Sequence, residues 1–517
     1  MVESMDRRDF LSSVLALTGL AVTNPGMFDG IISAAQAQGA NDAQPFSRTQ
    51  LLLDARKLAQ TGFVEPRLKM PEPYAEMSYD QYRSIRPKGD RALWRGEGRG
   101  FQFEFLHTGF LFKQPVQMFV IEDGKARPLG FDRDNFEYGP TIPAPEPGVD
   151  LGYSGFRVRS PINAADVWDE FAVFQGATYF RAVGKGQAYG LSARGLAIAT
   201  GDPRGEEFPN FRAFWIERPG QNATACVVYA LLDSPSVTGV YRFTLRPGEP
   251  TTVDVELTLF PRVELSHVGL GPLTSMFFFD ATNRTRVDDY RSAVHDSEGV
   301  AMWTGRGEWI WRPLANPRTL QISGFIDQNP RGFGLVQRSR DFRDYGDLNA
   351  RYDLRPTAWV EPVGDWGQGA VELIEIPTEQ DIHDNIVAYW RPREPMKVGQ
   401  EFSATYRLHW TNRIPNYPDQ IAKVTDTRAG LGTREGFRRY MIDFNGPNLP
   451  PVDQLKLDAS TSAGRLINTS LRQNSASGGV RVIFELDVRD IQLAELRVLL
   501  TANGQSVSET WLYRWTT

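Results

Sequence analysis

The sequence predicts an all-β protein built around a large antiparallel β-sandwich or barrel. Three observations support this prediction: apolar residues recur mainly at alternate positions, turn residues are frequent, and helical periodicity is almost absent. The chain has 517 residues, including 47 Gly and 34 Pro, and 12% of its residues are aromatic. Because a chain of this length is too long to fold around one ordinary hydrophobic core, two domains are expected after removal of a leader.

Composition excludes several classes of function. An apolar content of 41% and a charged content of 23% are typical of globular proteins and exclude a wholly disordered chain. The formal net charge of -6 and the pI near 5.6 argue against a nucleic-acid partner. Cys226 is the single cysteine and is expected to fill a small space in the core, and the chain has only five histidines. We therefore expect no disulfide, no metal site and no cofactor.

Residues 1–37 are predicted to form a signal peptide. Arg7 and Arg8 precede a short apolar run, and Ala37 ends a small-residue cleavage sequence. The paired arginines favour the twin-arginine route and a periplasmic product. A membrane anchor is the alternative, but Asn-Pro-Gly at 24–26 interrupts the run before the roughly 20 apolar residues that a span requires. No later segment is long and apolar enough to cross a membrane.

The mature chain begins with one predicted helix and continues as strands. Ser47 is a suitable N-cap for an amphipathic helix in 47–63. Phenylalanines alternate along 101–105 and are expected to repeat the pattern at Phe110 and Phe112 after a turn, and Asp123-Gly124 predicts a hairpin. Further strands are predicted at 212–219, 225–233, 239–248, 251–262, 320–326, 370–376 and 385–392.

The polar, proline-bearing stretch 411–423 is predicted to be a linker between two domains, 42–412 and 420–517. In the second, apolar residues alternate along 480–488, and Asn503-Gly504 predicts a hairpin. This pattern suits an immunoglobulin-like sandwich, although the usual Cys–Trp–Cys marker is missing.

Tryptophans and polar residues gather between 303 and 390, where six of the twelve tryptophans lie. The chain has no phosphate loop, no H-E-x-x-H and no G-x-S-x-G, which leaves carboxylates as the chemical tools. Aromatic faces and flanking polar groups are what a carbohydrate site requires. Each tryptophan could instead be core: Trp309 and Trp390 are expected there, whereas Trp303 and Trp366 lie beside glycines in loop-like segments.

Several long sequence motifs resemble those of the periplasmic glucan biosynthesis proteins of the OpgG/OpgD type, also called MdoG. They are "PLTSMFFF", "DDYRSAVHDSEG", "RPLANP", "NPRGFGLVQRSRDFRDY", "RPTAWVEPVGDWGQGAVELIEIPT", "HDNIVAYW" and "SETWLYRW". The resemblance runs from "YDQYRSIRP" at 79–87 to the carboxyl terminus. The twin-arginine leader is closer to the OpgD branch.

The resemblance implies a galactose-mutarotase-like β-sandwich (a supersandwich) followed by an immunoglobulin-like domain. It also implies a role in making osmoregulated periplasmic glucans. Family members are glycoside hydrolases or transglycosylases that act on a β-1,2-glucan backbone with anomeric inversion. The resemblance also implies that Asp384 is the general acid and Asp296 the general base, since both lie in the matching motifs.

An inverting pair needs two carboxyl groups about 6.5–9.5 Å apart, one protonated and one ionised. Partial burial and neighbouring acids favour the protonated form of Asp384, whereas Asp296 stands in a more polar word. His383 and Asn385 would point away from Asp384 in an ideal strand, which favours structural roles. Sugar subsites are assigned to Tyr290, Trp303, Arg338, Asp341, Trp359, Glu361 and Trp366.

Two other classes of function remain open. The first is a non-catalytic glucan-binding or scaffolding protein of the synthesis machinery, which would bind the polymer without changing its length. The second is an exported structural module with no sugar role. The carboxyl-terminal domain could close one side of the site or hold a homodimer together.

Overall fold

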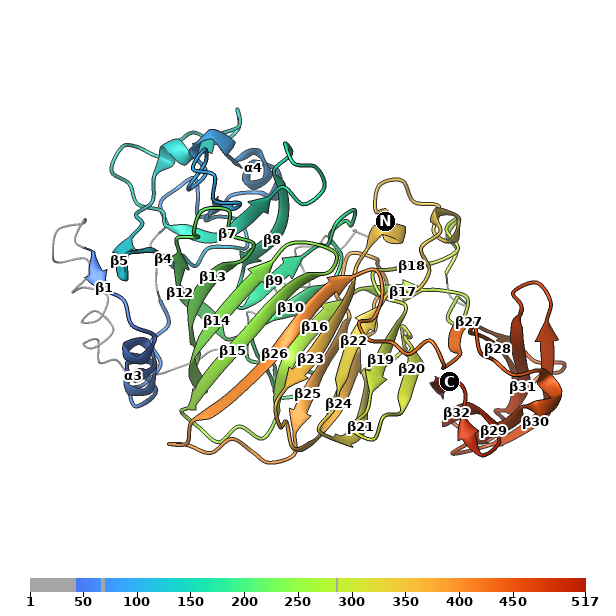
Figure 1. The fold of residues 1–517 in the computed structure, drawn as a ribbon. Helices are drawn as coiled ribbons and strands as arrows, with labels where there is room; N and C mark the ends of the chain where they lie inside the picture. Colours follow the sequence, from blue (N-terminus) through green and yellow to red (C-terminus); the bar gives the residue numbers. More distant parts are fainter. Residues whose placement is uncertain (1–42, 67–69, 285–286) are drawn as a thin grey trace. The chain divides into compact units, whose positions relative to one another are not determined.

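The structure, a computed structural model, describes residues 43–66, 70–284 and 287–517, so the predicted signal peptide lies outside the described residues. Nearly all regular elements are strands, and the prediction of an all-β chain is confirmed (Figure 1). The chain divides into two compact units. The first contains the described residues up to Gly186, Ser192–Pro272 and Arg391–Trp410, and the second contains Gln187–Leu191, Leu273–Trp390 and Thr411–Thr517.

In the first unit, the predicted helix is α3 (Arg48–Ala59), which follows β1 (Gln44–Pro45). The Ser47 hydroxyl accepts the Gln50 N–H, which confirms the predicted N-cap. A second helix, α4 (Tyr79–Ser84), is too short to show an apolar period and was not predicted. Ser78 and Gln81 form a capping box at its amino terminus. Within the described residues, no helix has the length and apolar character needed to span a membrane.

Two sheets of the first unit pack face to face. One has the order β1-β5-β4-β12-β13-β14-β15-β26 and the other β10-β9-β8-β7-β3. Phe174 of β8 contacts Phe214 of β12 and Phe243 of β14, with ring centroids 5.9 and 5.1 Å apart. These aromatic contacts make the interior of a β-sandwich.

The first sheet is made of β1 (Gln44–Pro45), β5 (Lys125–Pro128), β4 (Gln117–Glu122), β12 (Asn210–Glu217), β13 (Cys226–Asp233), β14 (Val237–Arg246), β15 (Thr251–Pro261) and β26 (Phe402–Thr411). The second is made of β3 (Gln102–His107), β7 (Tyr153–Ser160), β8 (Asp169–Gln175), β9 (Tyr179–Ala182) and β10 (Ser192–Arg194). Shorter elements are β2 (Arg86–Pro87), β6 (Phe136–Glu137), β11 (Ala197–Ile198), η1 (Gly89–Arg91) and η2 (Arg133–Asn135).

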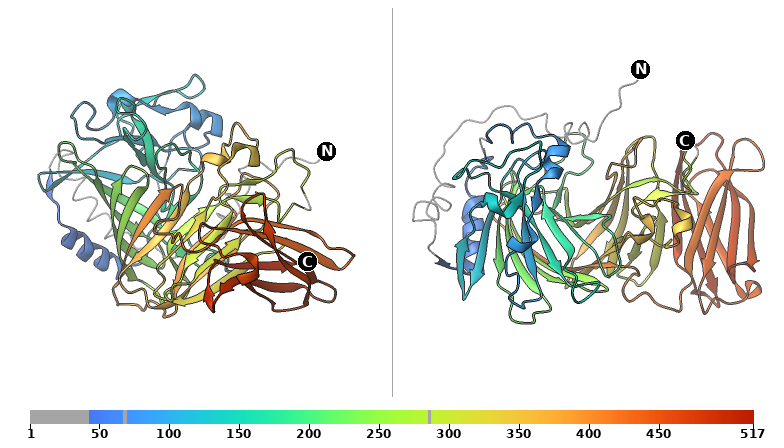
Figure 2. Two further views of the ribbon diagram at one scale, coloured as in Figure 1. Left: turned by 45° about the vertical axis from the view of Figure 1, so that its right-hand side comes forward. Right: turned by 90° about the horizontal axis from the view of Figure 1, so that it is seen from above.

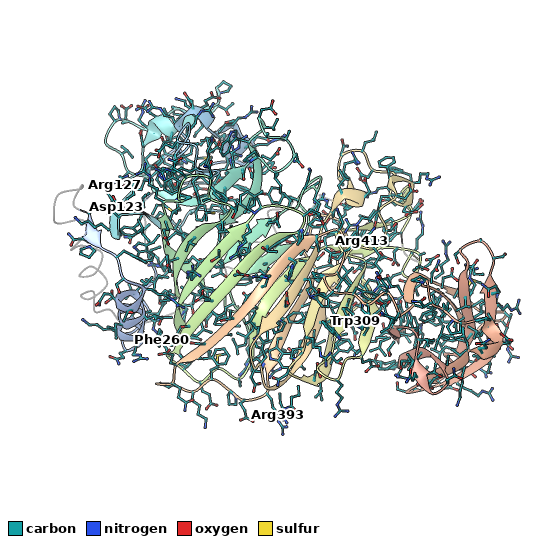
Figure 3. The ribbon with its side chains drawn as sticks, viewed as in Figure 1. Asp123, Arg127, Phe260, Trp309, Arg393 and Arg413 are labelled. Carbon is teal, nitrogen blue, oxygen red and sulfur yellow. The ribbon has the colours of Figure 1, made fainter. Side chains whose placement is uncertain are left out.

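The Asp123-Gly124 hairpin between β4 and β5 is confirmed, with both residues at positive φ (50° and 74°) (Asp123 is labelled in Figure 3). The alternation expected at Phe110 and Phe112 is wrong. The chain turns there, because Phe110 has φ 52° and the backbones of Gly109 and Phe112 bond each other in both directions.

The second unit contains a sheet of order β23-β22-β19-β20-β34-β32-β29 and a four-stranded sheet of order β27-β28-β31-β30. The strands that follow residue 423 are coloured orange to red in Figure 2. Strand β34 pairs in parallel with β20, with Trp511 opposite Trp311. One core cluster includes Trp309, labelled in Figure 3, together with Tyr440 and Phe484. Strands on both sides of residues 411–423 therefore share a sheet and a core, and the domain boundary read from the sequence stays a prediction.

The strands of these sheets are β19 (Gly299–Trp303), β20 (Trp309–Pro313), β22 (Gly332–Val336), β23 (Thr357–Val363), β27 (Lys423–Leu431), β28 (Phe437–Asn445), β29 (Lys456–Thr461), β30 (Arg465–Asn474), β31 (Gly479–Asp487), β32 (Leu493–Ala502) and β34 (Thr510–Thr516). A further group is β21 (Gln321–Gln328), β24 (Gln368–Glu375) and β25 (Ile386–Pro392). The remaining elements are β16 (Val268–Ser275), β17 (Phe277–Phe279), β18 (Val294–His295), β33 (Gln505–Ser506), η3 (Phe342–Asp344), η4 (Tyr352–Leu354) and η5 (Val452–Gln454).

Candidate active site

The two predicted acids belong to segments that are anchored on the same short strand, β17, in the second unit. Asp296 follows β18, which pairs with β17 so that His295 lies opposite Phe277. Asp384 is followed by Asn385, whose side chain accepts the Phe277 N–H at 2.8 Å and donates to the Phe277 carbonyl at 3.0 Å. Two segments that lie nearly ninety residues apart in the chain thus meet at one residue, Phe277.

Asp296 lies beside a guanidinium and not in hydrocarbon. Its residue is 7% exposed, and its Oδ1 lies 3.6 Å from Nε of Arg355. Arg355 donates to the carbonyls of Ala350 and Tyr189, and its guanidinium lies 5.5 Å from the Tyr352 ring centroid. A cation at this distance stabilises a carboxylate, as a general base requires.

Tyr352 connects the surroundings of the two words. Burial raises the pKa of its phenol well above the ordinary value, and the negative charges of Asp381 and Asp296 raise it further. Arg291 and Arg355 act in the opposite direction. The phenol therefore interacts electrostatically with the carboxylate of Asp296 and with that of Asp381, three residues before Asp384.

Arg291 holds together three carboxylates from three segments. Its Nη1 donates to Asp347 and Asp381, each at 3.0 Å, and its Nη2 donates to Asp289 at 2.7 Å. The hydrogen bond from Arg291 is the main reason why the pKa of Asp289 is lowered. No role was assigned to Tyr352, Arg291 or Arg355 from the sequence.

Asp384 is half-buried and is separated from the start of β25 by Asn385. Its neighbours have the structural roles expected of them: Asn385 is bonded to backbone groups, and Nδ1 of His383 lies 3.0 Å from the Thr378 hydroxyl oxygen. Trp390, expected in the core, is fully buried.

The predicted sugar subsites are not equally accessible. Tyr290 is 83% exposed and precedes Arg291, and Glu361 is half-buried on β23. Trp303 is half-buried and stacks on Trp309 at 5.1 Å, with the Arg331 guanidinium 5.2 Å from its ring centroid. Trp366 is 9% exposed, with its centroid 6.5 Å from that of Trp390.

Three of the predicted subsite residues have other partners. Trp359 is 2% exposed and lies in the core cluster with Trp309. Arg338 is bound to the carboxylate of Glu509. Asp341 is exposed, caps η3 and pairs with Arg343. The Trp359 ring is covered, and Arg338 and Asp341 are engaged in ion pairs, so these three side chains are less available to a sugar than the other four.

Comparison with known proteins decides the family. The family model of the periplasmic glucan biosynthesis protein MdoG matches residues 46–515. The chain belongs to the MdoG family. Its relatives include three proteins named glucans biosynthesis protein G. That of Rhodopseudomonas palustris is 47% identical and covers 99% of this chain and 100% of its own. That of Vibrio cholerae is 49% identical over 89% and 85%, and that of Bradyrhizobium diazoefficiens is 46% identical over 99% and 100%.

MdoG membership confirms the predicted family and a part in periplasmic glucan biosynthesis. The relatives carry the G name, and the OpgD branch stays a prediction. Among solved structures, a mutant glycoside hydrolase family 81 enzyme from Clostridium thermocellum matches 64% of this chain and 34% of its own at 9% identity. Its TM-score is 0.16, and a likeness this weak carries no argument.

Proposed function

We propose that the protein contributes to glucan biosynthesis by cleaving or rearranging β-1,2-linked glucan with inversion at the anomeric carbon. The observation that carries the proposal is the anchoring of the segments of Asp296 and Asp384 on β17, next to the Arg291–Tyr352 network. Two carboxyl groups in different surroundings are what inverting glycosidic cleavage needs.

In the proposed reaction, Asp384 gives its proton to the glycosidic oxygen as the C1–O bond breaks. Asp296 takes a proton from a water molecule, whose oxygen forms the new bond to C1 from the opposite face. The product is the α-anomer, and the two acids then exchange protons with solvent to regain their starting states. When a sugar hydroxyl replaces water as the nucleophile, the same steps produce transglycosylation.

Four residues remain candidates for sugar subsites: Tyr290, Trp303, Glu361 and Trp366. Tyr290 offers the most exposed aromatic face of the four, and Glu361 offers a carboxylate for sugar hydroxyls. We also propose export by the twin-arginine route. Changing Arg7 and Arg8 to lysine should retain the precursor inside the cell.

The deciding experiment incubates the purified mature protein with linear β-1,2-glucan. Chromatography should detect shorter or rearranged chains, and NMR of the first products should detect the α-anomer. Asp384→Asn and Asp296→Asn should each lower activity by at least about a hundredfold. Asp458→Asn, an exposed control on β29, should be fully active.

The outcomes separate the proposed enzyme from its main alternative. Full activity in either acid variant removes that residue from its role. Binding of the glucan without any change in chain length, unaffected by both substitutions, would instead establish a non-catalytic carrier or scaffold.

A further inference from the structure

The side chain of Asn385 uses its hydrogen-bonding groups on the backbone. Its Oδ1 accepts the Phe277 N–H at 2.8 Å, and its Nδ2 donates to the carbonyls of Phe277 and Ile376, both at 3.0 Å. Asn385 is 1% exposed. The amide therefore fixes the segment before β25 to both the N–H and the carbonyl of one residue of β17, Phe277.

Phe277 also anchors the segment of Asp296. Phe277 lies opposite His295 in the β17–β18 pair, and its ring stacks on the imidazole with centroids 5.5 Å apart. The next N–H, that of Asp296, donates to the Met276 carbonyl at 2.8 Å. Any displacement of β17 thus moves the backbone of Asp296.

A second buried amide, that of Gln337, holds β18 from another side. Its Nε2 donates to the carbonyls of His295 and Tyr352, at 3.2 and 3.1 Å, and its Oε1 lies 2.9 Å from Nδ1 of His295. Because both amide hydrogens face carbonyls, Oε1 is the acceptor and Nδ1 of His295 carries the proton. Burial lowers the pKa of His295 to about 4, so the ring is neutral near pH 7.

We propose that Asn385 and Gln337 are positioning residues that hold Asp384 and Asp296 at a fixed separation through their hydrogen bonds to β17 and β18. Asn385 directly follows Asp384 in the sequence, and Gln337 binds His295, the residue before Asp296. The inference rests on the proposed function. An inverting site must keep a water-sized gap between its acids, and a displacement of about 1 Å can cost about a hundredfold in rate.

Asn385 positions Asp384 and Gln337 positions Asp296, so substitutions of the two residues should have different kinetic effects. Asn385→Ala should displace the general acid and lower kcat on β-1,2-glucan about a hundredfold, with KM little changed. An aryl glycoside of β-1,2-linked glucose has a leaving group that departs without protonation, and the loss on it should shrink to less than about tenfold. Gln337→Met should displace the base, and its loss should persist on both substrates.

Stability must be separated from positioning. Each variant is assayed well below its own Tm. Tyr241→Phe is the control, because it removes one buried hydrogen bond, to the Gly195 carbonyl at 3.0 Å, in the first unit. This control should lower Tm without changing kcat. Asn385→Ser, which keeps a hydrogen-bonding oxygen, replaces Asn385→Ala if the latter does not fold.

Two results would overturn the inference while the proposed function stands. The first is a folded Asn385 variant and a folded Gln337→Met with unchanged kcat and only a lower Tm. The second is an equal loss for the Asn385 variant on both substrates. A wild-type protein that leaves β-1,2-glucan intact would instead remove the proposed function itself.

Discussion

Arg338 and Glu509 form a two-point ion pair in the second unit, with Nη2–Oε1 at 2.6 Å and Nη1–Oε2 at 2.9 Å. The Glu509 side chain is fully buried, and its Oε2 also accepts the Val424 N–H at 2.8 Å. The guanidinium lies 3.5 Å from the Trp311 ring centroid. Arg338 therefore joins the end of β22 to the segments that begin β27 and β34.

Removing one partner of this pair should strongly destabilise the protein. Arg338→Met leaves the Glu509 carboxylate buried without its cation, at a cost of about 3–5 kcal/mol. Denaturant unfolding followed by tryptophan fluorescence should detect the loss. Arg343→Ala, which breaks the exposed Arg343–Asp341 pair, should leave the stability almost unchanged, because water screens both charges.

The double variant Arg338→Met/Glu509→Gln should recover part of the stability lost in Arg338→Met, because no unpaired charge then remains buried. If Arg338→Met is as stable as the wild type, the pair contributes nothing to the fold. Arg338 would then return to the list of candidate ligands.

The burial of Trp359 yields a second prediction, at Gly332. A Cβ added to Gly332 would lie 2.3 Å from Cζ2 of the Trp359 indole, so Gly332→Ala should overpack the core at a cost of about 1–3 kcal/mol. Gly324→Ala is the matched control, since an added Cβ there meets no atom within 4 Å. Equal unfolding midpoints for the two variants would contradict this packing.

The sequence was informative where local chemistry decides the structure. The N-cap at Ser47, the Asp123-Gly124 turn and the long strands follow from side-chain pattern and turn geometry, and all are observed. Asn503-Gly504 likewise joins β32 to β33, with both residues at positive φ. Cys226 is buried, as expected.

The candidate site was less predictable, because its contacts join segments that are distant in the sequence. Arg291, Tyr352 and Gln337 acquire their roles only from carbonyls and carboxylates brought by other strands. Trp359 was predicted to be a sugar platform, and its burial in the core cluster was not foreseen for a similar reason. Composition cannot tell an indole that covers a glycine on the neighbouring strand from one that faces a ligand.

Asp280 provides a prediction about pH. Burial raises the pKa of its carboxyl from 3.8 to about 7, hydrogen bonds from Thr282 oppose this rise, and the charge of Glu298 adds to it. Between pH 4 and 7 the folded state therefore keeps a proton that the unfolded state has released. The contribution of Asp280 to stability falls as pH rises through this window.

Asp280→Asn removes this titration and should leave Tm unchanged at pH 4 but raise it at pH 8 relative to the wild type. Thermal unfolding at both pH values measures the difference between the two proteins, which cancels the titration of other groups. A variant that is less stable than the wild type at pH 8 would show that the ionised carboxylate is favoured in the fold.

Tyr290 is the most exposed of the proposed subsite residues, at 83%, and its ring centroid lies 5.8 Å from the guanidinium of Arg291. Tyr290→Ala removes an aromatic face beside the carboxylates that Arg291 holds. It should weaken glucan binding about tenfold, equivalent to about 1.4 kcal/mol, without changing Tm. Tyr290→Phe should bind nearly as the wild type does, because the ring is kept.

Calorimetric titration of the inactive Asp384→Asn protein measures the affinity, and Leu431→Ala, an equally exposed position on β27, is the control. Equal affinities in the Tyr290→Ala and Leu431→Ala proteins would remove Tyr290 from the site, since its exposure would then have no ligand to explain it.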